Sequence, residues 1–155
     1  MKLENFADKQ PTLKIEEYFL GKTTASGLFI DRLGKVRRQF TVEMEGIQQE
    51  DSFILNETFL YDDGEEEFRR WEIKKTGEKT YEGTSEDIKG IALGERSGNA
   101  INWHYTLKLK YGDGIMNVKF DDWLIMQDEK NVFNKATMKK FGIRLGDVYL
   151  FFTKQ

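Results

Sequence analysis

The chain contains no cysteine, a single proline and a single histidine among its 155 residues. The absence of cysteine excludes disulfide bonds, thiolate nucleophiles and thiolate metal sites. No nucleophile and orienting acid accompany His104 at a spacing typical of a catalytic triad. We therefore interpret His104 as a surface residue, and we expect no catalytic residue, no metal and no cofactor.

Long apolar runs and a strong charge of one sign are also missing. No run approaches the length of about 18 apolar residues that a membrane-spanning helix needs, and no secretory signal pattern is present. The formal net charge is only −3, which gives no general attraction to nucleic acid or anionic lipid. The chain does have 12 Phe, 6 Tyr and 3 Trp, enough to fill the core of one domain.

Alternation of apolar and polar residues begins after Gly21 and is the main structural signal. A period of two predicts strands, because successive side chains of a strand point to opposite faces. Turn sequences such as Asp62-Asp63-Gly64 are too short for crossover helices, so we expect antiparallel strands in up-and-down order. We favour a closed barrel over a sandwich, because closure removes exposed edges. The predicted strands are Ala25–Arg32, Lys35–Glu45, Ser52–Tyr61, Glu66–Lys75, Thr80–Ser85, Asp87–Glu95, Asn99–Lys110, Ile115–Gln127 and Asp147–Thr153.

The chain divides into a polar N-terminal arm, residues 1–12, and one barrel domain, residues 13–155. The segment Leu13–Leu20 is predicted to form a short helical turn, with Thr12 as its N-cap. The segment Asn134–Phe141 is ambiguous, because it fits either a short helix capped by its first residue or a further strand.

Strand parity places four charged residues, Arg38, Glu57, Arg69 and Asp122, on faces that are otherwise apolar. An unpaired buried charge is costly, so inward charges should pair with one another or with a ligand. A β-bulge would reverse the parity and turn any of the four outward. The apolar residues that define the interior are Val36, Phe40, Val42, Met44, Phe53, Leu55, Phe59, Trp71, Ile73, Ile101, Trp103, Tyr105, Leu107, Leu109, Met116, Val118, Phe120, Leu124 and Met126.

Three hypotheses fit the four charges. We favour a structural ion-pair network, hydrogen-bonded to Trp103 or Tyr105, because buried charges are usually paired inside the protein. A ligand anchor is the second, in which Arg38 or Arg69 receives a carboxylate or phosphate through its planar guanidinium. An enzyme that uses Glu57 or Asp122 as acid or base is the third and least favoured.

A small basic cluster near the C-terminus comprises Lys135, Lys139, Lys140 and Arg144. It could contact an anionic surface, but we interpret it as a solvated face.

A series of motifs follows in order along residues 11–154. They are Glu57-Thr58-Phe59, Tyr61-Asp62-Asp63-Gly64, Arg70-Trp71, Tyr81-Glu82-Gly83, Asp87-Ile88-Lys89-Gly90-Ile91-Ala92, Gly98-Asn99-Ala100, Trp103-His104-Tyr105, Phe120-Asp121-Asp122-Trp123, Asn134 and Lys140-Phe141-Gly142. In this order they resemble an uncharacterised bacterial family, a domain of unknown function regarded as lipocalin-like. The resemblance implies a lipocalin-like (calycin) barrel and assigns no activity.

Members of that family often start with a lipoprotein signal that ends in an acylated cysteine, followed by an arm similar to Glu4-Asn5-Phe6-Ala7. This sequence has neither the signal nor the cysteine. We expect that it begins just after that cysteine, which implies a location at the cell envelope. The alternative is a member that is not exported and stays in the cytoplasm.

These patterns predict an all-β, single antiparallel barrel with a short N-terminal helical turn. The leading hypothesis is a non-enzymatic protein that holds a small amphipathic, apolar or lipid-like ligand in the barrel. The alternatives are a structural or partner-binding envelope protein with a side-chain-filled barrel, and an enzyme with an interior carboxylate. We expect no nucleic-acid partner, and membrane contact only through a lipid anchor. The side chains expected at the ligand or in the interior polar network are Arg38, Glu57, Arg69, Trp71, Trp103, Tyr105 and Asp122.

Overall fold

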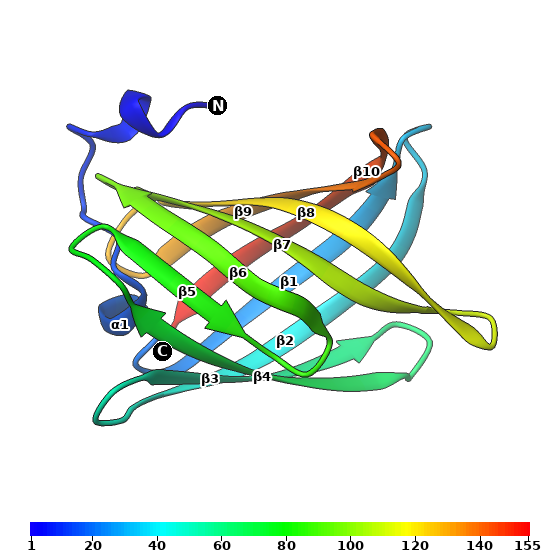
Figure 1. Cartoon of the computed structure of the whole chain (residues 1–155), viewed down its shortest axis with the longest axis horizontal. Coiled ribbons are helices and arrows are strands. Elements are labelled where there is room, and N and C mark those ends of the chain that lie inside the picture. Colours follow the sequence, from blue (N-terminus) through cyan, green and yellow to red (C-terminus); the bar gives the residue numbers. More distant parts are fainter.

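Ten antiparallel strands form a closed barrel in the computed structural model, which describes residues 1–155 (Figure 1). Each strand pairs with the next one along the chain, and β1 closes the barrel against β10. The predicted all-β, up-and-down barrel is therefore confirmed. The strands are β1 (Gly21–Asp31), β2 (Val36–Gln48), β3 (Phe53–Tyr61), β4 (Glu66–Lys75), β5 (Thr80–Thr84), β6 (Ile88–Ser97), β7 (Ala100–Tyr111), β8 (Gly114–Met126), β9 (Asn131–Lys140) and β10 (Ile143–Lys154).

The predicted helical turn is present but shorter than expected, and its cap differs. The helix α1 spans Ile15–Tyr18, and Lys14 stands at its N-cap position without a side-chain capping bond. The prediction of Thr12 as N-cap is wrong, because the Thr12 hydroxyl lies two residues too early and donates to Gln10 instead. A 3₁₀ helix, η1 (Leu3–Phe6), precedes it in the N-terminal arm.

The ambiguous segment Asn134–Phe141 belongs to strand β9 and its turn, so the strand alternative is confirmed and the capped helix is wrong. Asn134 cannot act as a cap because its side chain points inward and is 2% exposed. The strand ends where Phe141 takes a φ of 54° and begins the turn to β10.

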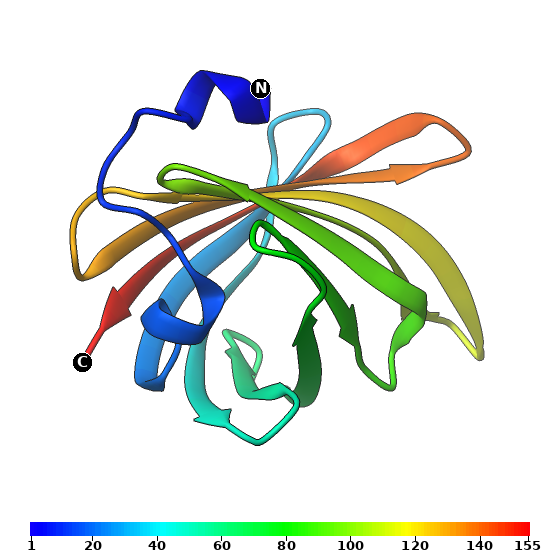
Figure 2. The same cartoon turned by 60° about the vertical axis from the view of Figure 1, so that its left-hand side comes forward.

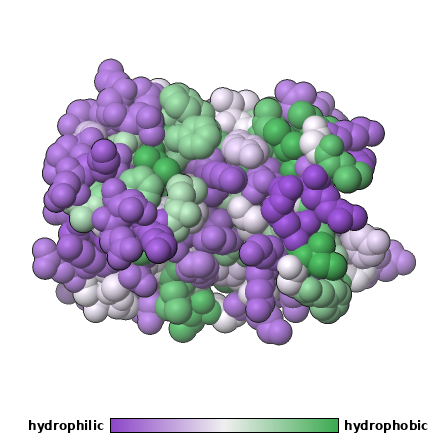
Figure 3. Space-filling model, turned by 90° about the horizontal axis from the view of Figure 1, so that it is seen from above, coloured by the Kyte–Doolittle hydropathy of each residue, from purple (hydrophilic) through white to green (hydrophobic).

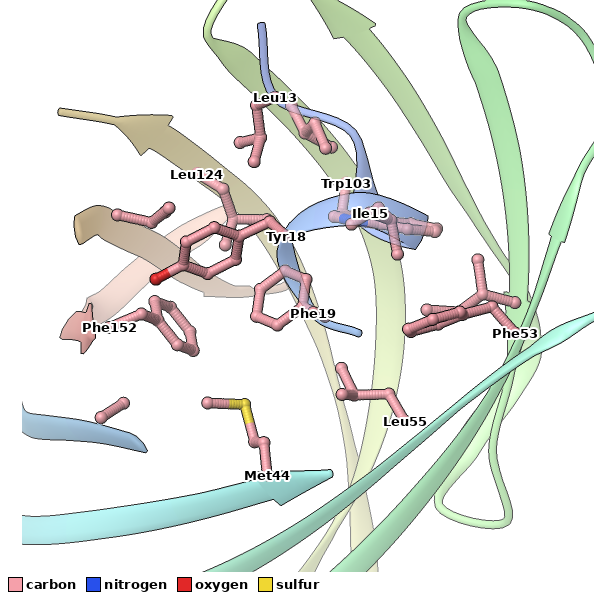
Figure 4. Packing of buried hydrophobic residues seen from close by; sticks show 14 of the residues in the cluster. Leu13, Ile15, Tyr18, Phe19, Met44, Phe53, Leu55, Trp103, Leu124 and Phe152 are labelled. Carbon is pink, nitrogen blue, oxygen red and sulfur yellow. The ribbon is translucent and has the colours of Figure 1, made fainter. Parts of the chain in front are cut away.

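The end of the barrel where β1 begins is closed by α1 (Figure 2). Leu13, Ile15 and Phe19 of this segment are buried with the inward residues of the strands. Figure 4 shows Phe19 lying among Met44, Leu55 and Phe152. The helix approaches β2 closely at Gly46, where a Cβ would lie 1.8 Å from the carbonyl oxygen of Phe19. A glycine is therefore required there for the chain to seal this end.

Side-chain hydrogen bonds tie α1 to the barrel wall. Tyr81 Oη on β5 donates to Glu16 Oε1 at 2.7 Å, and Lys75 Nζ lies 3.3 Å from Glu16 Oε2. Lys154 Nζ, near the end of β10, donates to the carbonyl oxygen of Leu20 at 2.9 Å and also to that of Tyr18. The cation thus satisfies carbonyl groups that the end of a helix leaves unpaired.

The opposite end of the barrel is formed by the turns β1–β2, β3–β4, β5–β6, β7–β8 and β9–β10, and we call it the mouth. No helix covers it (Figure 1). The N-terminal arm lies outside the barrel, where Phe6 contacts Trp123 with ring centroids 5.8 Å apart. None of the helices is both long and apolar enough to cross a bilayer.

The parity of the strands is confirmed along most of their length, with one exception at the mouth. Val42, Met44, Leu55, Ile101 and Leu124 are buried as predicted. The inward prediction for Val36 is wrong, because its exposed fraction is 45%. The register between β1 and β2 shifts there, so that Phe29 pairs with Arg38 but Ile30 pairs with Val36. The extra residue, Arg37, is a bulge that reverses the parity of Val36.

Candidate functional site

A cavity of about 410 Å³ lies inside the barrel, between the α1 plug and the mouth. Hydrophobic side chains make up 21 of its 28 lining residues, and its size is within the range of about 300–1,000 Å³ found for small-molecule sites. Ile15 and Phe19 form its floor, and Arg38, Tyr61 and Lys110 lie toward the mouth. All seven side chains singled out from the sequence line it, namely Arg38, Glu57, Arg69, Trp71, Trp103, Tyr105 and Asp122.

The first polar group of the cavity is built on β3 and β4. Glu57 and Arg69 are direct partners in the register of these strands, so their side chains emerge side by side. Arg69 Nη1 lies 3.9 Å from Glu57 Oε1, and Arg69 Nε donates to Asp87 Oδ2 at 2.8 Å. Trp71 Nε1 donates to Glu57 Oε1 at 3.0 Å. The guanidinium of Arg69 thus pairs with the carboxylates of Glu57 and Asp87, and the indole of Trp71 donates a hydrogen bond to Glu57.

The second polar group is built on β7, β8 and β9. Tyr105 Oη donates to Asp122 Oδ2 at 2.9 Å, and Asn134 Nδ2 donates to Asp122 Oδ1. The same amide nitrogen donates to the carbonyl oxygen of Trp123 at 2.8 Å, which fixes the orientation of Asn134. The ring of Tyr105 packs edge-on against Trp71, with centroids 5.6 Å apart, and so joins the two polar groups.

Burial raises the pKa of both interior carboxyls. The pKa of Glu57 rises to about 7, because burial outweighs the opposing effects of Arg69 and the Trp71 hydrogen bond. The pKa of Asp122 rises to about 6, because burial outweighs the hydrogen bonds from Asn134 and Tyr105. Burial and the charge of Asp122 also raise the pKa of Tyr105, which remains a hydrogen-bond donor.

Arg38 lies at the rim of the mouth and not in the interior group. Its guanidinium stacks over Tyr61 at 3.5 Å and pairs with Asp63 and Glu65 at 3.3 and 3.5 Å. Its side chain is 33% exposed. Arg38 thus lies on the inward face and lines the cavity, but its charge pairs with exposed acids at the rim and not with the interior carboxyls, because position 38 is close to the start of β2.

The group at mid-depth therefore contains one cation, Arg69, and two carboxyls, Glu57 and Asp122. Asp87 pairs with Arg69 from the mouth side, where the side chain of Asp87 is 34% exposed. Since Arg69 is already engaged by two carboxylates, it is a poor anchor for a third anion. At mid-depth the carboxyls Glu57 and Asp122 outnumber the one cation, which favours a ligand group that donates hydrogen bonds to the ionised carboxylates.

Sequence reasoning missed two residues, Asp87 and Asn134, that pair with the predicted interior charges. Asp87 was predicted as the first residue of a strand, but β6 begins at Ile88, so Asp87 lies in the turn after β5 and strand parity does not place its side chain. Asn134 would have been found had Asn134–Phe141 been taken as a strand, since it then shares a face with Ala136 and Met138. The sequence analysis expected Trp103 or Tyr105 to form hydrogen bonds with the interior charges. Tyr105 does so with Asp122, and Trp71, not Trp103, is the tryptophan that donates to Glu57. His104 lies on the outer surface, 3.8 Å from Asp121.

A family model described as "Protein of unknown function (DUF3833)" matches residues 1–154 of the chain. No curated protein matches the sequence. Among solved structures, the fold is similar to an S-type phycobiliprotein lyase from Guillardia theta, with a TM-score of 0.67, 9% identity, and coverage of 100% of this chain and 98% of that one. It is also similar to Rv2717c from M. tuberculosis, with a TM-score of 0.62, 12% identity, and coverage of 96% and 99%. At these identities the similarity concerns the lipocalin-like barrel fold alone.

Proposed function

The chain belongs to the DUF3833 family, and we propose that it is a non-enzymatic protein that holds a small amphipathic or apolar ligand inside its barrel. The observation that carries the proposal is the cavity of about 410 Å³, whose wall is mostly hydrophobic and whose polar groups are few and grouped together. Ligand sites in proteins commonly have this composition, with apolar walls for affinity and a few polar groups for orientation.

The polar end of the ligand contacts Glu57, Arg69 and Asp122, which lie at mid-depth in the barrel. A hydroxyl, amide or amine group suits this position, because it can donate to the carboxylates. A carboxylate or phosphate suits it less, because Arg69 is already paired with Glu57 and Asp87. The apolar part of the ligand packs against the aromatic rings of Phe40, Trp103 and their neighbours.

The filled-barrel alternative is not supported by the size of the cavity. The enzyme alternative has one supporting observation, which is the pKa of about 7 at Glu57. A carboxyl that titrates near neutral pH can accept and return a proton. The two functions differ in outcome, because a binding protein releases its ligand unchanged whereas an enzyme converts it.

The test is direct recovery of the ligand followed by titration. Native mass spectrometry of gently purified protein should show a bound small molecule that organic extraction releases unchanged. Dodecanol and dodecanoate should then be titrated against the empty protein, with tryptophan fluorescence as the readout, because Trp71 and Trp103 line the cavity. We expect tighter binding of the alcohol at about pH 8, and a smaller difference at about pH 6, where Glu57 and Asp122 take up protons.

A matched pair of variants makes this test specific. Val148 lines the cavity and its neighbour Tyr149 faces the outer wall of β10. Val148→Trp should fill the cavity and abolish binding, whereas Tyr149→Trp should leave the affinity unchanged. Absence of any bound molecule, together with no response to either probe, would refute the proposed function.

The envelope location expected from the resemblance remains a prediction. Fractionation of the source cells, with the protein detected by antibody, would test it. Recovery in the soluble cytoplasmic fraction would favour the alternative location.

A further inference from the structure

Three hairpins at the mouth expose large hydrophobic side chains at their tips. Leu33 in the β1–β2 turn is 83% exposed, Tyr111 at the end of β7 is 72% exposed, and Phe141 in the β9–β10 turn is 89% exposed. Each has a second exposed apolar neighbour in the same hairpin, and these neighbours are Val36, Ile115 and Ile143. We call these six residues the apolar tips.

The hairpins that carry the apolar tips are neighbours in the barrel. The strand order β2-β1-β10-β9-β8-β7 places the β1–β2, β9–β10 and β7–β8 turns next to one another around the mouth. Figure 3 shows hydrophobic side chains at the right-hand end of the molecule, the mouth end, in groups separated by hydrophilic ones, and others elsewhere on this face. Exposure of several large apolar groups at one end of a protein typically marks an interaction site.

Charge divides the mouth into two opposite halves. The three hairpin segments with the apolar tips, residues 31–37, 110–115 and 139–145, carry seven Lys or Arg and two Asp. The other two turns, residues 62–67 and 85–87, carry seven Asp or Glu and no cation. The overall net charge of −3 does not reveal this separation of basic and acidic turns.

Several of the cations beside the apolar tips have no acidic partner. Arg37 and Arg144 are paired with Asp31 and Asp147, at 2.7 Å each. Arg32, Lys35 and Lys110 form no ion pair in the structure and are exposed. They remain available to an anionic partner.

We propose that the apolar tips and their flanking cations dock the mouth of the barrel onto an anionic lipid surface. Apolar residues surrounded by Lys and Arg match the boundary between lipid headgroups and acyl chains, where the apolar groups insert and the cations attract anionic headgroups. The tips project from three separate turns and do not form a flat face, which suits insertion between lipids better than contact with a folded partner. The acidic half of the mouth is repelled by the same headgroups, so the barrel tilts toward its basic half.

Vesicle co-sedimentation of the full chain tests the proposal. Vesicles of phosphatidylcholine with about one-third phosphatidylglycerol should bind the protein, and vesicles of phosphatidylcholine alone should bind it far more weakly. Added salt should weaken the binding, because it screens the attraction between exposed charges. The variant Leu33→Ser/Tyr111→Ser/Phe141→Ser should lower the affinity by about tenfold or more.

The matched control carries three substitutions of exposed apolar residues on the outer wall, Leu60→Ser/Phe133→Ser/Phe151→Ser. These residues are 47%, 40% and 44% exposed and lie away from the apolar tips. Vesicle binding of this variant should equal that of the natural sequence, and urea unfolding should confirm that both triple variants fold.

The role of charge needs its own variant. Arg32→Gln/Lys35→Gln/Lys110→Gln should lower the affinity for anionic vesicles by about a hundredfold, since each cation near such a surface contributes about a factor of five. Equal binding by the natural sequence and either mouth variant would overturn the proposal. Retention on immobilised polyglutamate without binding to vesicles would overturn it in favour of an acidic protein partner.

Docking does not depend on the cavity ligand. Val148→Trp should therefore keep its vesicle binding even where it loses a ligand, which separates failure of this inference from failure of the proposed function.

Discussion

The two ends of the barrel are made of the same strands but differ in filling. At the closed end, α1 and the residue after it place Ile15, Tyr18 and Phe19 among inward side chains, and all three are at most 3% exposed. At the mouth no segment enters the barrel, and the hollow between the plug and the rim leaves about 410 Å³ free. Hydrophobic packing is therefore concentrated at one end and ligand access at the other.

This difference implies that the closed end of the barrel mainly determines stability and the mouth mainly determines binding. The closed end stabilises the fold through buried side chains, hydrogen bonds to α1 and the close approach of the chain at Gly46. The mouth contributes exposed apolar tips and charges, whose replacement removes little packing. Substitutions at the closed end should thus alter folding, and those at the mouth should alter binding. The predictions below test this contrast, beginning with the largest expected effect.

Phe19→Ala should destabilise the protein by about 3–5 kcal/mol, because it removes a buried ring and leaves a void between α1 and the strands. Urea denaturation followed by circular dichroism measures the free energy of unfolding. The matched substitution at the mouth, Phe141→Ala, should change it by no more than about 0.5 kcal/mol, because that ring is 89% exposed. A similar decrease in the free energy of unfolding in both variants would contradict the contrast between the two ends.

Glu57→Gln should change how stability depends on pH. The pKa of Glu57 is about 7 in the folded protein against an ordinary value of 4.5, so folding favours the protonated form. The stabilisation linked to Glu57 is complete below the ordinary value and is lost as the pH rises through the folded value. Relative to Glu57→Gln, the natural sequence should lose on the order of 3 kcal/mol between about pH 4 and pH 8.

Urea denaturation at several pH values measures the effect of Glu57→Gln. The exposed Glu43 on the outer face of β2 supplies the control, and Glu43→Gln should have a profile parallel to the natural one. A parallel profile for Glu57→Gln as well would show that burial does not perturb this carboxyl.

Tyr105→Phe should cost about 1 kcal/mol, because it removes the hydroxyl that donates to Asp122 inside the barrel. Loss of this hydrogen bond should also raise the pKa of Asp122 above its value of about 6. Carboxyl chemical shifts in an NMR titration report that pKa directly. Tyr149→Phe on the outer wall is the control, and an unchanged titration of Asp122 in Tyr105→Phe would contradict the interior hydrogen bond.

Arg38→Gln should have the smallest effect on stability, within about 0.5 kcal/mol, because its ion pairs with Asp63 and Glu65 are exposed to solvent. It should instead speed the release of a bound ligand several-fold, because the guanidinium over Tyr61 narrows the rim. Stopped-flow release of dodecanol from the protein, followed by tryptophan fluorescence, gives the rate. An unchanged rate would show that Arg38 does not restrict passage.

Much of the fold and part of the site could be predicted because their signals are local. Alternation with a period of two identifies strands, and short glycine-containing turns allow only antiparallel neighbours. Parity alone was sufficient to place Glu57, Arg69 and Asp122 inside, since all three lie well within regular strands. Where the strand geometry is irregular the same rule fails, as the bulge at Arg37 shows for Val36.

Other features depended on contacts between distant segments. Asp87, in the β5–β6 turn at the mouth, accepts a hydrogen bond from Arg69, which lies 18 residues earlier on β4. The role of α1 as a plug arises from Phe19 meeting Phe152, with ring centroids 5.6 Å apart, and no local pattern encodes that meeting. The division of the mouth into basic and acidic halves likewise appears only when the turns are placed in barrel order.

The amino-acid sequence by itself determined the antiparallel barrel and the inward direction of most apolar residues, because both follow from side-chain alternation along each strand. Only the tertiary structure decided that one end is plugged, that Arg38 stays at the rim, and that Arg69 pairs with both Glu57 and Asp87. These depend on barrel closure, which brings together side chains that the chain itself keeps far apart.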